Sequence, residues 1–244
     1  MRAAGRLAPI AVAVALLGLA LTGCLDERAE LKAPPGGAAV TIETADGIAL
    51  AGRLWGADAD RVLIYLHEYG QDQTAWWPLA ARPLPGRPSV LTFDFRGHGA
   101  SPGRANDLRG MRRDVEAALA FARARDYGQI VLVGAGMGAA AGMLAAAGDP
   151  AVALIGLSAP GAFGDLHPLA VAPDFAGRLA LIAAADDLSA QQSFEQLRAA
   201  ALLPAWRALL VPGRAHGAAL LVHATEALLA FYERALAEFW SGAT

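Results

Sequence analysis

The chain has 244 residues, of which 55% are hydrophobic and 18% charged, and its formal net charge is −3 at pH 7. This composition excludes intrinsic disorder, and the charge offers no basic surface for nucleic acid. A chain of this length can bury a substantial apolar core. Its single cysteine, Cys24, excludes an internal disulfide and a cysteine-built zinc site.

The first 23 residues have the pattern of an export signal. Two arginines precede an apolar run, residues 7–21, which is shorter than the about 20 apolar residues of a membrane span. The run ends in Leu-Thr-Gly-Cys, which resembles the lipobox of bacterial lipoproteins. The resemblance implies cleavage after Gly23 and lipidation of Cys24. The alternative is an ordinary signal peptide with an incidental cysteine.

Residues 24–37 are polar and rich in proline and glycine, which predicts a tether between a lipid anchor and a folded domain at residues 38–244. The same resemblance implies anchoring in a bacterial cell envelope, on the periplasmic face of a membrane. Leu25, in place of aspartate after the cysteine, favours the outer membrane. We expect a monomer.

From residue 38 onward, apolar runs of strand length alternate with helical patterns. Ala38–Glu43 and Ile48–Trp55 predict an antiparallel pair that turns at Asp46-Gly47. Six later runs are apolar on both faces, as buried parallel strands are: Arg61–Leu66, Ser89–Asp94, Gln129–Val133, Val152–Leu157, Leu179–Ala183 and Arg207–Val211. The predicted helices are Thr74–Arg82, Asp107–Arg125, Met137–Ala147, Ser193–Leu202 and Ala219–Phe239. This alternation predicts one α/β domain with a mostly parallel sheet and helices on both faces.

Glycine-rich or polar segments follow five of these strands, where open parallel sheets carry their sites. They are residues 67–72 (His-Glu-Tyr-Gly-Gln-Asp), 94–101 (Asp-Phe-Arg-Gly-His-Gly-Ala-Ser), 134–138 (Gly-Ala-Gly-Met-Gly), 186–187 (Asp-Asp) and 212–217 (Pro-Gly-Arg-Ala-His-Gly). In this order and spacing they resemble the α/β-hydrolase family, over about residues 38–240. The resemblance implies the α/β-hydrolase fold. The short stretch between Ser158 and Arg178 implies no cap domain, or a minimal one.

The first segment takes, by this resemblance, the place of the loop that supplies an oxyanion donor. His67, Glu68 and Tyr69 would line the pocket, and backbone N–H groups of this loop and of Met137 would be the donors. Glu68 stands where the family usually has glycine. Its carboxylate would either repel an oxyanion or direct a water molecule as a base.

The later segments occupy the positions of nucleophile, acid and base in the family's order. His216 takes the place of the base. Asp187 or Asp186 takes the place of the acid that orients the imidazole, and the spacing favours Asp187 slightly. Gly136 takes the place of the nucleophilic serine. Glycine tolerates the strained backbone of this turn, but it has no hydroxyl group to attack a substrate.

Three hypotheses follow. We favour a degenerate hydrolase that binds a small acyl or ester-type molecule without efficient turnover. The alternative is an active carboxylic-ester or amide hydrolase that uses water, or another nucleophile such as Ser158, with His216 and the acid. A dinucleotide-binding domain, suggested by Gly134-x-Gly136-x-x-Ala139, lacks the acidic residue after the next strand. The dispersed histidines predict no metal site, and we expect no cofactor.

Overall fold

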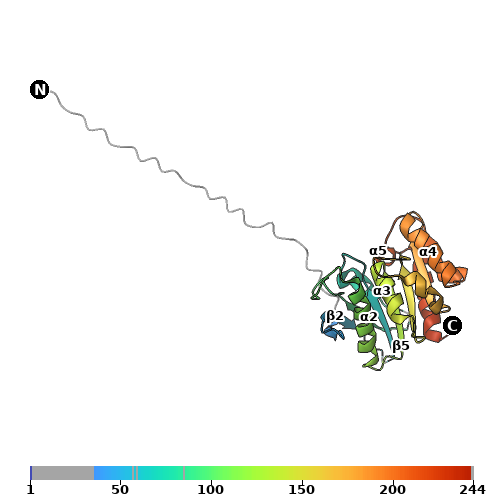
Figure 1. The fold of residues 1–244 in the computed structure, drawn as a ribbon, viewed down its shortest axis with the longest axis horizontal. Helices are drawn as coiled ribbons and strands as arrows, with labels where there is room; N and C mark the ends of the chain where they lie inside the picture. Colours follow the sequence, from blue (N-terminus) through green and yellow to red (C-terminus); the bar gives the residue numbers. More distant parts are fainter. Residues whose placement is uncertain (2–35, 57, 59, 85, 243–244) are drawn as a thin grey trace. The chain divides into compact units, whose positions relative to one another are not determined.

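The computed structural model describes residues 1, 36–56, 58, 60–84 and 86–242 (Figure 1). Residues 36–242 belong to one compact unit. The predicted lipidation site at Cys24, the signal peptide and most of the tether lie outside the described residues. Within them, no helix has the length and apolar character needed to cross a membrane.

Eight strands form one sheet in the order β1-β2-β4-β3-β5-β6-β7-β8. Their bounds are β1 Ala38–Glu43, β2 Ala49–Trp55, β3 Arg61–Leu66, β4 Ser89–Phe93, β5 Gln129–Ala135, β6 Val152–Leu157, β7 Leu179–Ala184 and β8 Ala208–Val211. The pair β1–β2 is antiparallel, as predicted, and β2 also runs antiparallel to β4. All later neighbours are parallel, so the predicted mostly parallel sheet is confirmed.

The α-helices are α1 Trp77–Ala80, α2 Leu108–Arg123, α3 Met137–Ala146, α4 Leu188–Ala200, α5 Ala219–Val222 and α6 Glu226–Ser241. The helix predicted at Thr74–Arg82 is a 3₁₀ turn, Gln73–Trp76, that continues into the short α1. The single helix predicted over Ala219–Phe239 was wrong. The chain leaves α5 at His223, and the Thr225 side chain accepts the Leu228 N–H to start α6.

Helix α4 also begins earlier than predicted, at Leu188 instead of Ser193. The side chain of Asp187 accepts the N–H of Ala190 and so caps the helix, which the apolar pattern alone does not reveal. This cap places an acidic side chain at the end of the turn that follows β7.

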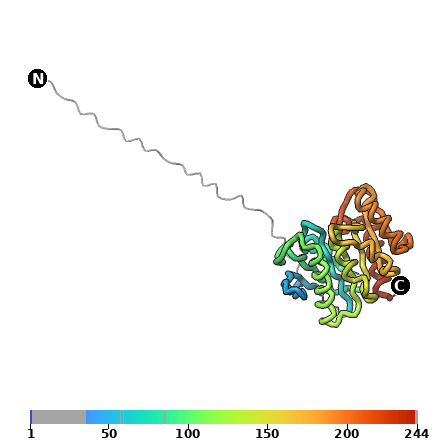
Figure 2. Tube along the Cα trace, in the orientation of Figure 1, coloured from blue at the N-terminus to red at the C-terminus, as the bar shows by residue number. Residues whose placement is uncertain are grey.

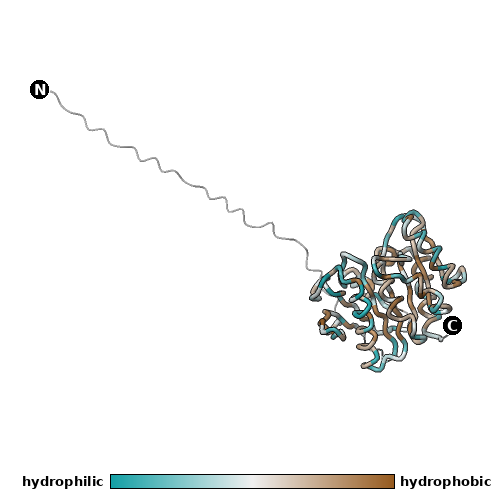
Figure 3. The backbone as a smooth tube through the Cα atoms, viewed as in Figure 1, coloured by the Kyte–Doolittle hydropathy of each residue, from teal (hydrophilic) through white to brown (hydrophobic). Residues whose placement is uncertain are grey.

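The core has two parts, one on each face of the sheet. Alternate residues of β3 illustrate the division. Ile64 belongs to the cluster that includes buried residues of α2, α3 and α4, and Tyr65 belongs to the cluster that includes buried residues of α1, α5 and α6. Figure 2 traces the chain through these layers, and Figure 3 shows hydrophobic residues concentrated in the strands at the centre. The predicted helices on both faces are therefore confirmed. Between β6 and β7 the chain forms a 3₁₀ helix, Pro168–Phe175, rather than a separate cap.

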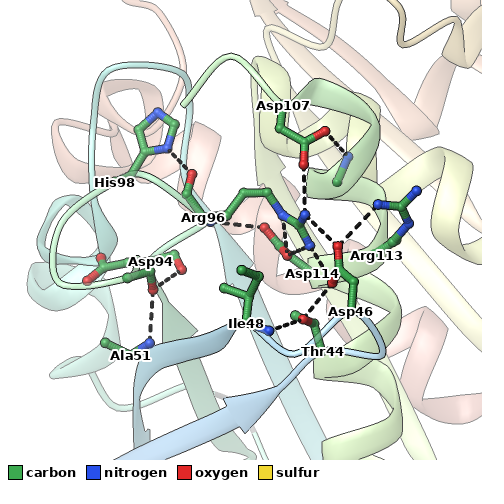
Figure 4. A network of polar contacts seen from close by, with 12 residues as sticks. Thr44, Asp46, Ile48, Ala51, Asp94, Arg96, His98, Asp107, Arg113 and Asp114 are labelled. Carbon is green, nitrogen blue, oxygen red and sulfur yellow. Dashed lines mark hydrogen bonds and ion pairs between the residues drawn. The ribbon is translucent and has the colours of Figure 1, made fainter. Parts of the chain in front are cut away.

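A buried arginine joins three elements beside the end of β4 (Figure 4). The Arg96 side chain is 3% exposed and donates to Asp114 at 2.7 Å. It also donates to Asp46 in the β1–β2 turn and to Asp107 at the start of α2, each at 2.8 Å. The guanidinium group therefore fixes the loop at residues 94–101 against the sheet and α2.

Replacing Arg96 with alanine is expected to lower the free energy of unfolding by about 3–5 kcal/mol, because the buried Asp114 carboxylate loses its cation. Urea denaturation measures this change. The control is Arg112→Ala, which breaks an exposed pair with Glu116 and should cost less than about 1 kcal/mol. Equal effects of the two substitutions would contradict the structural role of Arg96.

The other polar side chains of this loop bond within it and to neighbouring segments, since Asp94 accepts the N–H of Gln73 and Ser101 accepts the N–H of Ala51. The ring nitrogen Nδ1 of His98 lies 3.1 Å from the Arg96 carbonyl oxygen, and the Ser101 hydroxyl donates to the Asp94 carbonyl at 2.6 Å. The loop at residues 94–101, which carries much of the family resemblance, thus stabilises the fold.

Candidate active site

The parallel strands deliver His216 and two aspartates to the same edge of the sheet. Nδ1 of His216, on the loop after β8, lies 2.5 Å from Oδ2 of Asp187, on the turn after β7. Asp186 instead accepts the backbone N–H of Gly213 at 3.2 Å. The partner of the imidazole is therefore Asp187, and Asp186 holds the loop that carries the histidine.

Gly136 lies at the tight turn between β5 and α3, with φ +47° and ψ −117°. A Cβ atom at this position would lie 3.7 Å from Nε2 of His216 and 3.3 Å from Cβ of Glu68. The missing side chain would therefore point at the nitrogen that is not bound to Asp187. This is the direction in which a nucleophile would meet its base.

The carboxylate of Glu68 lies beside this gap. Its Oε2 is 3.6 Å from Nε2 of His216, and its side chain is only 20% exposed. Burial raises the pKa of the Glu68 carboxyl, while the neighbouring His216 and the N–H of Ala218 partly offset this rise. His216 thus lies between two carboxylates, Asp187 on Nδ1 and Glu68 on Nε2.

A Glu68→Gln variant is expected to be more stable than the native chain at pH 7. A carboxyl whose pKa is raised by folding binds its proton more tightly in the folded state, so stability falls as pH rises above its ordinary value of 4.5. Glutamine removes this loss of stability. The difference in unfolding free energy between the two chains should vanish at lower pH, where Glu68 is protonated in both the folded and the unfolded state. Urea denaturation at a series of pH values tests this, and a difference that is independent of pH would contradict it.

His67 does not line the cleft, contrary to the prediction. Its side chain is fully buried, with Nε2 accepting the N–H of Phe95 at 3.0 Å. Nδ1 therefore carries the proton and donates to the carbonyl oxygen of Glu68 at 2.9 Å. Burial lowers the pKa of His67 to about 4, which keeps the ring neutral. Its observed contacts fix the backbone of Glu68.

A cleft of about 400 Å³ opens over Gly136. Glu68, His216 and Met137 line it, and Met137 begins α3, whose start has no side-chain cap. Tyr69 and Phe163, with ring centroids 5.7 Å apart, stand on one side. The remaining lining residues are small or polar, and no lysine or arginine belongs to the described lining. The cleft therefore suits a small neutral molecule better than an anion.

Ser158, the other serine considered as a nucleophile, follows β6 and also lines the cleft. Its hydroxyl oxygen accepts the N–H of Gly217 at 3.1 Å, and its backbone has φ +47°. This bond supports the loop next to His216. Ser158 thus has an observed contact that explains its place at the end of β6.

Phe163, Ser189 and Ser193 also line the cleft, although no motif in the sequence indicated them. The two serines are four residues apart on α4 and so share one face of that helix. Their position depends on the start of α4, which Asp187 caps. Recognition of Asp187 as a helix cap in the sequence could have revealed them. Phe163 lies on the segment between β6 and β7, and the course of that segment in the folded chain brings its side chain to the cleft.

A larger cavity, of about 750 Å³, lies beside β8 and α6 and is lined mainly by apolar residues. Its lining includes neither Gly136 nor His216, which both line the smaller cleft, so we place the candidate site there. No group of three histidine, cysteine, aspartate or glutamate side chains suited to a metal ion occurs among the residues that the structure describes.

A model of the alpha/beta hydrolase family matches residues 63–240, and the chain belongs to this family. A solved esterase from Pyrococcus furiosus has a TM-score of 0.66 and 18% identity, covering 84% of this chain and 90% of that one. An alpha/beta hydrolase from Novosphingobium aromaticivorans has a TM-score of 0.64 and 17% identity, covering 82% and 98%.

A membrane phospholipase A, described as a bacterial virulence factor, has a TM-score of 0.66 and 17% identity, covering 84% of this chain and 87% of that one. At these identities the likeness shows the fold alone. Among curated protein sequences, none matches the chain.

Proposed function

We propose that this protein hydrolyses a small, neutral ester or amide by direct attack of water, without forming an acyl-enzyme at the elbow. The observation that carries this proposal is the His216–Asp187 pair, because the second ring nitrogen, Nε2, faces the position of the missing nucleophile. Asp187 orients the imidazole and stabilises its protonated form, so His216 can exchange protons with the reacting atoms. The esterase and phospholipase among similar structures support an ester as the substrate.

The substrate carbonyl would lie over Gly136, with its oxygen toward the start of α3. Backbone N–H groups at a helix start without a side-chain cap favour negative charge. The N–H of Met137, at the start of α3, is one of these groups. The N–H of Glu68 or Tyr69 would be the second donor. The absence of lysine and arginine from the described lining favours a substrate without a free acid group.

Hydrolysis of a short-chain aryl ester by the full-length chain, purified in detergent, tests this function. His216→Ala is expected to lower turnover by about 10²–10⁴-fold, as the loss of a general acid–base group does. His223→Ala, an exposed histidine at the end of α5, is the matched control and should leave turnover unchanged. An inert native chain would overturn the proposal. A His216→Ala variant with the turnover of an active native chain would overturn it as well.

A second candidate function is ligand binding without turnover, favoured by the absence of any nucleophilic side chain at Gly136. Under this hypothesis the cleft holds an acyl or ester-type molecule, and His216 serves only its recognition. Calorimetric titration of a stable ester or amide analogue into the native chain distinguishes it from the first. Tight binding together with an inert native chain would support this second function.

We further propose that the protein is a monomer, exported and anchored by lipid on Cys24 at the periplasmic face of a bacterial membrane. The charged start, the apolar run and the Leu-Thr-Gly-Cys ending support this. Cys24→Ala should remove the lipid label and release the protein from the membrane fraction. A variant that remains in the membrane would contradict the anchor, and light scattering would test the monomer.

A further inference from the structure

We propose that Glu68 takes over from the missing serine: its carboxylate and the imidazole of His216 together hold the attacking water over Gly136, and Glu68 removes the proton of that water. This inference rests on the hydrolase function proposed above. It assigns Glu68 as a catalytic residue. The water reacts in the space that a side chain at position 136 would fill.

The geometry around Gly136 suits a shared water molecule. Oε2 of Glu68 and Nε2 of His216 are 3.6 Å apart. Measured from the Cβ position at Gly136, these two atoms lie 3.8 and 3.7 Å away. Two polar atoms at that separation can both reach one water at about 2.8 Å. Such a water would stand where a serine hydroxyl group would otherwise be.

The surrounding chain holds the Glu68 carboxylate in this position. A Cβ atom at Gly217 would come within 2.3 Å of Oε2 of Glu68, so only glycine at that position leaves room. The N–H of Ala218 lies close enough to the carboxylate to lower its pKa, and His67 holds the carbonyl oxygen of Glu68 at 2.9 Å. The glycines at 136 and 217 thus accommodate the glutamate from two sides.

The electrostatic environment gives the two groups different roles. Glu68 is largely buried, and the described lining contains no lysine or arginine to neutralise it. Burial raises the pKa of this carboxyl, which makes it a stronger base than an exposed glutamate. His216 has Asp187 on its other nitrogen, which orients the ring with Nε2 toward the reacting atoms and lets it serve as the acid.

The reaction then balances as follows. The water oxygen forms a bond to the carbonyl carbon while one of its O–H bonds breaks and the proton passes to Glu68. The tetrahedral intermediate collapses, the bond from the carbonyl carbon to the leaving group breaks, and the departing oxygen or nitrogen takes a proton from Nε2 of His216. Glu68 finally returns a proton to Nε2, so ester and water yield acid and alcohol with both groups restored.

Comparison of Glu68→Gln with Glu195→Gln tests this role. Glutamine keeps the size of the side chain and an oxygen for the Ala218 N–H, but it cannot accept the proton of water. We expect turnover of the aryl ester to fall by about 10²–10⁴-fold, with little change in KM. Glu195, on α4 and 48% exposed, is absent from the lining and should give native turnover.

A second variant guards against a folding defect. The methyl group of Gly136→Ala would crowd the place of the water, at 3.3 Å from Cβ of Glu68, while both polar side chains remain in the chain. Turnover should therefore fall in a chain with native circular dichroism. A single turnover in water labelled with oxygen-18 adds an independent readout. Direct attack places one label in the product acid at that first turnover and none in Glu68.

The outcomes separate this inference from the function on which it rests. An inert native chain overturns the hydrolase proposal itself. A native chain that depends on His216 while Glu68→Gln keeps native turnover overturns only the role of Glu68. Label in the Glu68 side chain would show that the carboxylate attacks the substrate itself, and it would overturn the water mechanism.

Discussion

The double variant Gly136→Ser with Glu68→Gly is expected to hydrolyse short aryl esters through an acyl-enzyme, at least about 10²-fold faster than the native chain. In an unrelated serine protease, removal of the nucleophile costs about 10⁶ in turnover, so restoring one can recover a large part of such a factor. A Cβ atom at Gly136 would point toward Nε2 of His216 at 3.7 Å, within reach for a serine hydroxyl. The partner pair His216–Asp187 is already in place.

The second substitution is needed because of crowding and charge. A serine at position 136 would bring its Cβ within 3.3 Å of Cβ of Glu68, and the carboxylate would stand beside the forming oxyanion. Gly136→Ser alone should therefore gain much less than the double variant. The positive φ of +47° also makes any side chain at this position strained, at a cost of about 1–3 kcal/mol in stability.

Rapid mixing with excess ester measures this gain as a burst of aryl alcohol, one equivalent per chain, and mass spectrometry locates the acyl group on the peptide that contains position 136. Adding His216→Ala to the double variant is the control and should remove the burst. A double variant without a burst would show that the oxyanion donors or the cleft no longer support acyl transfer.

Asp187→Asn is expected to lower native ester turnover by about 10²–10⁴-fold, whereas Asp186→Asn should change it little. Asparagine at 187 can still cap α4 through its side-chain oxygen, so the fold is retained. It cannot stabilise protonated His216, and it can stabilise the wrong tautomer of the ring. The same change in a serine protease costs about 10⁴ in turnover.

The neighbouring Asp186→Asn provides a matched control, because the two substitutions are chemically identical and adjacent in the chain. Asp186 accepts the N–H of Gly213, which an asparagine oxygen can also do. Steady-state kinetics of both variants, with thermal unfolding as a check on folding, tests the assignment. Equal losses in the two variants would contradict Asp187 as the specific partner of His216.

Apolar patterning was sufficient to predict the sheet of this protein. Short runs that are apolar on both faces can be buried only between two layers of helices, and each of the predicted strands occurs at or within two residues of its expected bounds. The order of the segments after these strands also predicted which residues would meet at the carboxyl edge, since parallel strands bring those ends together. His216, Gly136 and Glu68 are examples.

The contacts inside the site depended on the tertiary structure. The choice between Asp186 and Asp187 follows from which carboxylate the end of β7 turns toward the loop after β8, a direction that adjacent identical residues do not encode. His67 was expected at the cleft wall, yet its ring is buried behind Glu68. The approach of Glu68 to His216 requires space beside Gly136 and Gly217, which lie far apart in the chain. Periodicity and motif order reflect local burial, whereas these side-chain positions follow from packing between segments that only the folded chain brings together.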